Sequence, residues 1–156
     1  MNILISDIPR EGILRLVMDD QKSGNALSED MMSRLMETIK KASIDESIKI
    51  IILAAKGGIF SSGHNLKEIT DAREQIEYGE PYFKQLFDQC SSLMQLIVNC
   101  PKPVIAQISG IATAAGCQLV ATCDLAYASS SAKFATPGVN LGLFCSTPMV
   151  LSLIHI

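Results

Sequence analysis

The residues with the clearest potential for chemistry lie in the stretch GGIFSSGHNLKEI, residues 57–69. It follows the apolar run IKIIILAAK and precedes a short segment of helical character. Glycines at a turn from strand to helix let backbone N–H groups face a negative group. Three kinds of group fit that description: a phosphate, a metal-bound anion, and an oxygen that becomes charged only during a reaction.

The phosphate alternative fails on the residues that follow the glycines. Gly58 and Gly63 have the spacing of the G-x-x-x-x-G part of a P-loop. However, His64 and Asn65 stand where Lys and Ser or Thr would contact phosphate and magnesium. The dinucleotide fingerprint G-x-G-x-x-G is absent as well. The stretch is therefore not predicted to be a phosphate loop.

A second glycine-containing turn, ISGIATAAGCQ at residues 108–118, has the same setting. Each turn follows an apolar strand and opens a helix, so each can present a free backbone N–H at the start of that helix. Two such donors that converge on one point form an oxyanion hole. Either turn by itself is more often only a turn, so the prediction depends on the pair.

The totals limit the class of protein. The chain has 156 residues, which suits one domain, and its 48% hydrophobic and 19% charged residues favour a well-buried core. The 13 Lys and Arg against 16 Asp and Glu give a net charge of −3. This balance argues against nucleic-acid binding, which normally requires a basic face.

The cysteines and the chain's apolar runs restrict the compartment. The five cysteines form no C-x-x-C pair and the chain has two histidines, so no metal site is predicted. An odd number of cysteines without a secretory signal fits free thiols in a reducing compartment. No apolar run approaches the ~20 residues of a membrane helix, and the strand-like start MNILISDIPREG shows no targeting peptide. We therefore expect a soluble, intracellular protein without a membrane span.

The N-terminal patterns predict the first elements around the two turns. ILISDI and ILRLVM, separated by PREG, predict a hairpin. Ser28 is the expected N-cap of a helix with Glu29 and Asp30 in its first turn. An apolar stripe with helical spacing continues that helix: Met31, Met32, Leu35, Met36 and Ile39.

The rest of the chain alternates between strands and helices. Residues 71–81 are polar and are expected to form a mobile loop. A helix with apolar positions from Phe83 to Ile97 follows and ends at CPKP, and residues 112–123 are expected to form the next helix. The alternation predicts an α/β fold with a mainly parallel sheet. The expected strands are residues 48–55, 104–109 and 124–129, and the first two, which precede the glycine turns, are expected to be buried.

Four segments carry a family resemblance. FSSGHNLKEI is similar to F-x-A-G-x-D-[IL]-x-E, and PKPVIAQISGIATAAGCQ is similar to P-K-P-[VI]-I-A-x-[IV]-x-G-x-x-x-G-G-G. FATPGVNLGL is similar to F-x-x-P-E-x-x-[LI]-G, and NALS to N-A-L-[ND]. In this order, over residues 3–148, they resemble the crotonase (enoyl-CoA hydratase/isomerase) superfamily. SSGH, ATAAGCQ and FATPGVN are shared with its type 3 enoyl-CoA hydratase domain-containing proteins.

The resemblance implies a crotonase (ClpP-like) spiral of repeated ββα units, stacked as a right-handed superhelix. The family adds a C-terminal helical region that helps to build homotrimers or hexamers, and the chain stops before it. We therefore expect an incomplete crotonase core at residues 1–150 and a truncation tail at residues 151–156. The bare apolar residues of that tail are expected to promote aggregation.

The resemblance also assigns the two donors and a coenzyme A site. In this family the thioester carbonyl of an acyl-CoA accepts two backbone N–H bonds, and the matching donors here are His64 and Ala115. The family's triple glycine reads Ala114, Ala115 and Gly116, so the added methyl groups make the geometry depend on φ. No cofactor is implied beyond coenzyme A as part of the substrate. Its expected contacts are Lys22, Ala26, Ser62, Gly63, His64, Asn65, Leu66, Lys67 and Gly116.

The two glutamates with which the hydratases add water correspond here to Gln118 and Gly138. Neither residue can exchange a proton near neutral pH, and residues 125–156 contain no Asp or Glu. The expected function is therefore binding of acyl-CoA thioesters at the oxyanion hole without efficient hydration. Whether the protein is an enzyme stays open.

Several alternatives stay open beside that function. A decarboxylating branch that acts on methylmalonyl-CoA also has G-H-[DN]-[IL] and T-P-x-x-N-L-G, and it forms an enolate without a catalytic carboxylate. A non-catalytic acyl-CoA-binding regulator of fatty-acid metabolism needs only the hole. A ClpP-like serine peptidase shares the spiral, but no Ser–His pair can be placed.

Two roles are open for His64: a loop histidine that suits the backbone conformation of the turn, or a ring that lies over the acyl group. The expected compartment is cytoplasmic for a bacterial chain and mitochondrial for a eukaryotic chain that lacks its transit peptide.

Overall fold

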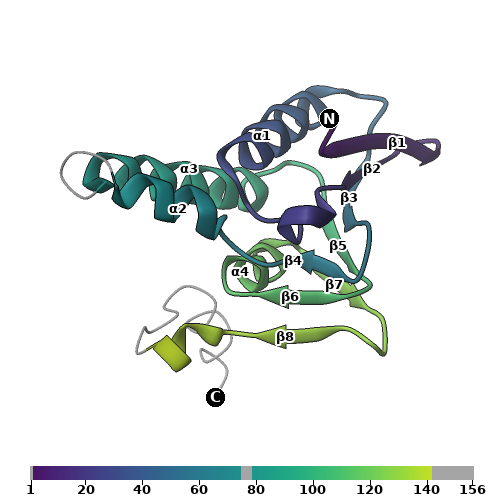
Figure 1. Cartoon of the computed structure of the whole chain (residues 1–156). Helices are drawn as coiled ribbons and strands as arrows, with labels where there is room; N and C mark the ends of the chain where they lie inside the picture. Colours follow the sequence, from purple (N-terminus) through teal and green to yellow (C-terminus); the bar gives the residue numbers. More distant parts are fainter. Residues whose placement is uncertain (1, 75–78, 142–156) are drawn as a thin grey trace, which may run out of the picture.

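The chain folds into strand–strand–helix units that follow one another along two sheets. The computed structural model describes residues 2–74 and 79–141. Within these ranges one sheet has five strands in the order β1-β2-β3-β5-β7, and the other has three in the order β4-β6-β8. From β3 onward each unit sends one strand to each sheet before its helix, as Figure 1 shows for β5, β6 and α4. The spiral of repeated ββα units that the resemblance implies is confirmed.

The five-stranded sheet contains the long apolar runs. The first two strands form the predicted antiparallel hairpin, and the strands after them are parallel. Leu53 pairs with Leu16 on one side and with Ala106 on the other, so buried side chains stack across the sheet. The predicted α/β class with a mainly parallel sheet is confirmed. The strands are β1 (Leu4–Arg10), β2 (Ile13–Met18), β3 (Ile50–Ala55), β5 (Val104–Ile108) and β7 (Leu125–Ala128).

The apolar patterns alone do not predict the three-stranded sheet. Its parallel strands are β4 (Ile59–Ser61), β6 (Ile111–Thr113) and β8 (Lys133–Ala135). Each is only three residues long, and β4 and β6 lie beside glycine turns, so no alternation of polar and apolar residues marks them. The helix predicted over residues 112–123 accordingly begins later, at Ala115, because Ala112 and Thr113 belong to β6.

The first long helix, α1 (Glu29–Ile44), begins where the sequence predicts. The Oγ of Ser28 accepts a hydrogen bond from the N–H of Met31 at 3.2 Å. Glu29 and Asp30 lie in the first turn, where the positive end of the helix dipole favours acidic side chains. The apolar stripe faces the core, and its buried members are Met31, Met32, Leu35, Ile39 and Ala42.

The helices α2 (Leu66–Arg73) and α3 (Glu80–Val98) leave a shorter connection than predicted. The loop expected over residues 71–81 is wrong at both ends, because residues 71–73 belong to α2 and residues 80–81 to α3. Apart from the buried Ala72, these helix ends are exposed and polar, so no apolar stripe identifies them. Pro81 lies in the first turn of α3, where a missing N–H costs nothing.

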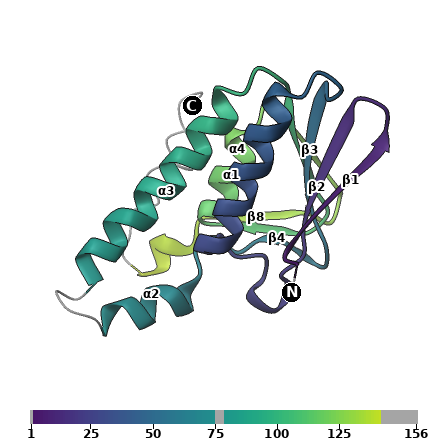
Figure 2. The ribbon, with the colours of Figure 1, turned by 90° about the horizontal axis from the view of Figure 1, so that it is seen from above.

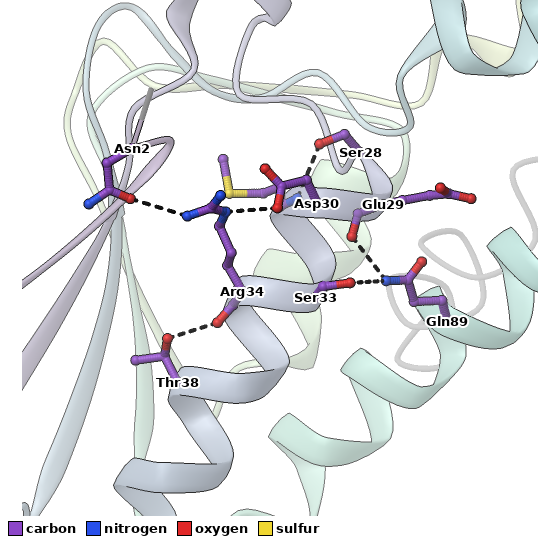
Figure 3. A network of polar contacts seen from close by, with 9 residues as sticks. Asn2, Ser28, Glu29, Asp30, Ser33, Arg34, Thr38 and Gln89 are labelled. Carbon is purple, nitrogen blue, oxygen red and sulfur yellow. Dashed lines mark hydrogen bonds and ion pairs between the residues drawn. The ribbon is translucent and has the colours of Figure 1, made fainter.

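α3 is fixed to α1 by its apolar face and by one amide. The Nε2 of Gln89 donates hydrogen bonds to the backbone O of Glu29 at 3.0 Å and to the Oγ of Ser33 at 2.8 Å, as Figure 3 shows. Figures 1 and 2 both show α2 beside the N-terminal part of α3. The buried face of α3 consists of Leu86, Cys90, Leu93, Met94 and Ile97.

The short helix α4 (Ala115–Thr122) lies directly on β4. A Cβ atom on Gly116 would be 2.4 Å from the backbone O of Ser61, so only glycine permits this approach. No helix in the described ranges is long and apolar enough to cross a membrane. The predicted core boundary at residue 150 and the tail at 151–156 lie outside the described residues.

Candidate functional site

The two predicted donors and one of the two predicted glutamate positions come shortly after the carboxyl ends of the three short strands. The strands are parallel, with Thr113 of β6 opposite Ala135 of β8, so their ends meet at one edge of the sheet (Figure 1). His64, Ala115 and Gly138 each come within three residues of such an end. Residues that are far apart in the sequence are therefore brought to one edge.

The first turn, between β4 and α2, presents the N–H of His64. Gly63 has a φ of 89°, and its backbone O accepts a hydrogen bond from the N–H of Leu27 at 2.7 Å. Leu27 and His64 also form an isolated parallel bridge, which fixes the turn against the segment before α1. Among the residues that the structure describes, the backbone N–H of His64 has no hydrogen-bond partner.

The second turn, between β6 and α4, presents the N–H of Ala115. Ala115 is the first residue of α4, so its N–H has no acceptor inside the helix, and none is found elsewhere in the described ranges. The N–H of Ala114 donates to the backbone O of Ala135 at 3.0 Å. The backbone O of Ala114 accepts from the N–H groups of Cys117 and Gln118 at 3.0 and 3.3 Å, which orients the peptide that carries the donor.

Ala114 adopts a backbone conformation that suits glycine. Its φ is 50° and its ψ is −123°, a combination that residues with a Cβ rarely adopt. The dependence on φ that the sequence raises for the Ala-Ala-Gly triplet is therefore confirmed at its first residue. Such a conformation costs of order 1–3 kcal/mol, and here it persists because the turn is held at both of its backbone polar groups.

The two turns are in contact with each other. A Cβ atom placed on Gly63 would lie 3.0 Å from the Cβ of Ala114 and 3.1 Å from the N of Ala115. The Oγ1 of Thr113 donates to the backbone O of Ser62 at 3.1 Å, which links the same two segments. The donor-bearing turns are thus neighbours, as the prediction of a shared hole requires.

The imidazole ring of His64 extends from this point toward α3. It contacts Phe87 edge to face, with ring centroids 5.8 Å apart and an interplanar angle of 82°. Its Nδ1 atom is buried and has no hydrogen-bond partner among the described residues. Burial lowers the pKa of His64 below its ordinary value of 6.5, and a hydrogen bond to the Leu27 backbone offsets this only in part.

The two positions that the resemblance assigns to the hydratase glutamates hold no proton-transfer group. Gln118 is half-buried in the first half of α4, and its backbone O accepts from the Oγ1 of Thr122 at 2.7 Å. Gly138 lies in the 3-10 helix η3 (Pro137–Leu141). Neither an amide nor a bare backbone can act as general acid or base near neutral pH.

The sequence reasoning missed a partly buried carboxylate on α2. An oxygen of Glu68 accepts from the N–H of Glu29 at 3.3 Å, at the start of α1. Burial raises the pKa of Glu68, and burial together with Glu68 raises the pKa of Tyr82 to about 12. The spacing of Asn65 and Glu68 at the N-cap and third position resembles a capping box, and this signal could have found the residue.

The two segments expected to contact coenzyme A, around residues 22–26 and 62–67, lie side by side. Asn25, which was not among the predicted contacts, connects the first of them by hydrogen bonds to β4 and the residues before it, which precede the second. Asn25 is fully buried with a φ of 51°. Its Oδ1 accepts from the N–H of Asp20 at 2.8 Å, and its Nδ2 donates to the backbone O atoms of Lys56 and Ile59 at 3.0 and 2.7 Å. This amide ties the loop before α1 to β4. The N-A-L motif contains Asn25, but nothing in it shows these three contacts.

The expected coenzyme A contacts differ in exposure. Ala26 is buried, whereas Lys22, in the 3-10 helix η1 (Gln21–Ser23), is exposed, as are Leu66 and Lys67. The Oγ of Ser62 donates to the backbone O of Ser23 at 3.1 Å, so these two segments are neighbours. Asn65 is the N-cap of α2, Gly63 carries the positive φ, and Gly116 packs on Ser61. In the described ranges no group of three or more metal-ligating side chains is present.

A spiral of ββα units that brings two free backbone donors to the ends of its short strands defines a protein of the crotonase fold. The sequence profile of the enoyl-CoA hydratase/isomerase family matches residues 9–155, and the chain belongs to this family. The resemblance stated on the motifs is thereby confirmed.

Relatives and solved structures agree with this assignment. The chain is 50% identical over 139 residues to mitochondrial enoyl-CoA hydratase domain-containing protein 3 of Xenopus laevis, covering 89% of this chain and 46% of the relative. It is 49% identical over 140 residues to the human protein of the same name, covering 90% and 45%. The crystal structure of that human protein matches with a TM-score of 0.87 at 44% identity, over 98% of this chain and 58% of the other. An enoyl-CoA hydratase of Mycobacterium smegmatis matches with a TM-score of 0.88 at 43% identity, over 100% and 59%. The chain spans about half the length of the curated relatives it matches.

Proposed function

We propose that the chain binds the thioester carbonyl of an acyl-CoA between the backbone N–H groups of His64 and Ala115. The observation that supports this proposal is that two neighbouring turns at one sheet edge each carry an N–H without a partner among the described residues. A largely buried N–H without an acceptor is unfavourable unless a ligand accepts from it. The names of the relatives, as enoyl-CoA hydratase proteins, indicate the same class of substrate.

Chemistry at this site would consist of stabilising an enolate oxygen. Negative charge that develops on the thioester oxygen would be met by both N–H groups and by the positive end of α4, which begins at Ala115. A preorganised donor of this kind lowers a barrier by roughly 3 kcal/mol. We propose no efficient hydration, because Gln118 and Gly138 stand where the acid and base are needed.

The rest of the coenzyme A would follow the segments that Asn25 ties together. We propose that the adenine and pantetheine lie along Ala26 and residues 62–66. The phosphates would be met by Lys22 or Lys67, whose side chains are exposed.

Two alternatives use the same hole. Decarboxylation of a methylmalonyl-CoA-like thioester needs no catalytic carboxylate. However, burial lowers the pKa of His64 and favours its neutral form, so its ring offers no positive charge to the carboxylate of such a substrate. A non-catalytic acyl-CoA-binding regulator of fatty-acid metabolism needs no chemistry at all.

For the full-length protein we propose a homotrimer or hexamer. We also propose an intracellular location, mitochondrial in a eukaryote, as in the relatives' names, or cytoplasmic in a bacterium.

A thermal-shift panel of acyl-CoAs on the full-length protein tests the proposal. Acyl-CoA should stabilise the fold more than free coenzyme A or ATP does, because only the thioester carbonyl reaches both donors. At about 100 times Kd the stabilisation is roughly 2.7 kcal/mol. The absence of a shift with every member of a broad acyl-CoA set would remove this function.

Hydration of crotonyl-CoA tests the loss of the glutamates. The unmodified protein should be at or near background, and the double variant Gln118→Glu with Gly138→Glu should gain measurable activity. Each single variant should do little, because acid and base act as a unit. Rapid hydration by the unmodified protein would show that the catalytic pair lies elsewhere.

A further inference from the structure

The N-terminus of α1 is attached to the first donor turn, to α2 and to α3. The N–H of Leu27, two residues before the helix, donates to the backbone O of Gly63 at 2.7 Å, directly before the first donor. The N–H of Glu29 donates to a carboxylate oxygen of Glu68 on α2 at 3.3 Å. The backbone O of Glu29 accepts from the Nε2 of Gln89 on α3 at 3.0 Å, as Figure 3 shows. The start of α1 therefore aligns three parts of the proposed site.

Of these three attachments, the one to α2 is made by a charged side chain. Glu68 is the third residue of α2, a position from which a glutamate ordinarily reaches back to the N-cap of its own helix. Here one of its oxygens accepts from another helix. The N–H of Glu29 has no acceptor inside α1, and the negative charge of Glu68 lies at the positive end of that helix. The contact thus satisfies a donor and joins two helices.

The two ends of α2 are held differently. Its one fully buried residue, Ala72, lies near the C-terminal end, and Ile69 is half-buried against the core. A Cβ atom on Gly79 would lie 2.6 Å from the backbone O of Ala72, so the C-terminal end is tightly packed. The N-terminal end follows directly after His64, and Glu68 attaches it to α1. The direction in which α2 leaves the first donor turn therefore depends on Glu68.

The surroundings of Glu68 use its oxygen but disfavour its charge. Burial raises the pKa of its carboxyl group above the ordinary value of 4.5, and the charge of Glu29 raises it further, while the hydrogen bond from the Glu29 backbone lowers it only in part. Burial, followed by the charges of Glu68 and Glu29, also raises the pKa of Tyr82 on α3 to about 12. The hydrogen bond and the charge of Glu68 can therefore be tested separately.

We propose that Glu68 is a positioning residue of the thioester site. By joining α2 to the N-terminus of α1 it fixes the turn before α2, and so it fixes the N–H of His64 relative to the N–H of Ala115. The inference rests on the proposed binding of acyl-CoA and deepens it, because it names a side chain that sets the distance between the two donors without touching the ligand. A ligand that uses both donors is more sensitive to this distance than a ligand that uses neither.

Three substitutions on α2 separate the reach of the side chain from its charge. Glu68→Asp keeps the carboxylate but shortens the side chain by one bond, about 1.5 Å, so the contact with the N–H of Glu29 is lost. Glu68→Gln removes the charge but keeps an oxygen at the same reach. Both residue types suit the first turn of a helix, so both variants should fold. Asp71→Asn, at an exposed position of the same helix, is the matched control for the loss of a charge.

The measurement compares two ligands that differ by the thioester. Butyryl-CoA and free coenzyme A are titrated by calorimetry into the full-length protein and each variant. The unmodified protein should bind butyryl-CoA more tightly. In Glu68→Asp the ratio of the two affinities should fall by about fivefold, the equivalent of one hydrogen bond. In Glu68→Gln and Asp71→Asn the ratio should stay within about twofold of the unmodified value. The urea midpoint of Glu68→Gln at neutral pH should not be lower than that of the unmodified protein, because the disfavoured charge is gone.

The outcomes separate this inference from the function on which it rests. If the unmodified protein does not prefer butyryl-CoA to free coenzyme A, the proposed function fails and the inference fails with it. If the preference is present and Glu68→Asp keeps it, or if Glu68→Gln loses as much of it as Glu68→Asp, acyl-CoA binding stands and the positioning role is wrong. A general loss of stability lowers both affinities and leaves their ratio unchanged, so it does not imitate the expected result.

Discussion

The turn after β4 and the turn after β6 have the same proposed role, the presentation of a backbone N–H, but are built from different residues. In each, the residue before the proposed donor has a positive φ: Gly63 at 89° before His64, and Ala114 at 50° before Ala115. Glycine adopts such angles readily, whereas alanine does so at a cost of order 1–3 kcal/mol. The first turn is thus stabilised by its residue type, and the second must be stabilised by its neighbours.

The neighbours of the second turn can be named. The N–H of Ala114 donates to the backbone O of Ala135 in β8, and its backbone O accepts from the first N–H groups of α4. Each hydrogen bond contributes about 1 kcal/mol, so together they offset the strain. The second donor therefore depends on β8 and on the first turn of α4, and the first donor does not.

The largest expected effect comes from separating α4 from β4. In Gly116→Ala the new Cβ would lie 2.4 Å from the backbone O of Ser61, so the helix must move. We expect a loss of about 3 kcal/mol in the free energy of unfolding, measured by urea denaturation. Gly58→Ala is the control, because its Cβ meets no atom within 4 Å, and it should change stability by less than about 0.5 kcal/mol. Equal effects of the two substitutions would contradict the close packing.

A smaller loss is expected in the first turn. Gly63→Ala forces a Cβ onto a φ of 89° and places it 3.0 Å from the Cβ of Ala114. The free energy of unfolding should fall by about 2 kcal/mol. Acyl-CoA should also lose its extra stabilisation over free coenzyme A in a thermal shift, because the two donors move apart. An unchanged urea midpoint would mean that the turn does not need glycine.

The contrast between the turns also shows what a sequence can predict. α1 was predictable because its apolar residues repeat with the period of a helix. The hairpin and the parallel strands of the large sheet were predictable because they are short apolar runs. The small sheet was not, because a three-residue strand such as β4 is too short for a period. The ends of α2 and α3 were predicted to be a loop for a related reason, since one buried alanine, Ala72, among exposed polar residues makes no apolar stripe.

The site was predictable in part. Motif spacing assigned the donor role to His64 and Ala115, which stays a prediction, and the structure brings their turns together. The positive φ of Ala114 was not predictable, because alanine gives no signal of a glycine-like conformation and the cause lies in distant hydrogen bonds. The amide of Asn25, which ties three backbone positions together, depends on tertiary contacts in the same way.

The reverse substitution in the second turn should stabilise the protein. Ala114→Gly removes the strain at φ 50° but makes the unfolded chain more flexible, so the expected net gain is about 1 kcal/mol. Ala121→Gly, the same change at an exposed position of α4, should instead lose about 0.5 kcal/mol. Urea denaturation of both variants measures the opposite signs. A loss in Ala114→Gly as large as that in Ala121→Gly would show that the alanine is not strained.

The smallest effect concerns the protonation of His64 beside the first donor. Its pKa in the folded protein lies below its ordinary value of 6.5 because the ring is buried. The unfolded chain therefore binds the proton more readily than the folded one, so this residue stabilises the fold fully above pH 6.5 and less as the pH falls below that value. Between pH 7.5 and pH 5.5 the free energy of unfolding should fall more for the unmodified protein than for His64→Phe, by less than about 1 kcal/mol. Groups that titrate in both proteins, such as Glu68, cancel in this difference. A fall of equal size in the two proteins would mean that the ring is open to water. Of the two turns, the second alone would then contain a residue that destabilises the fold, the strained Ala114.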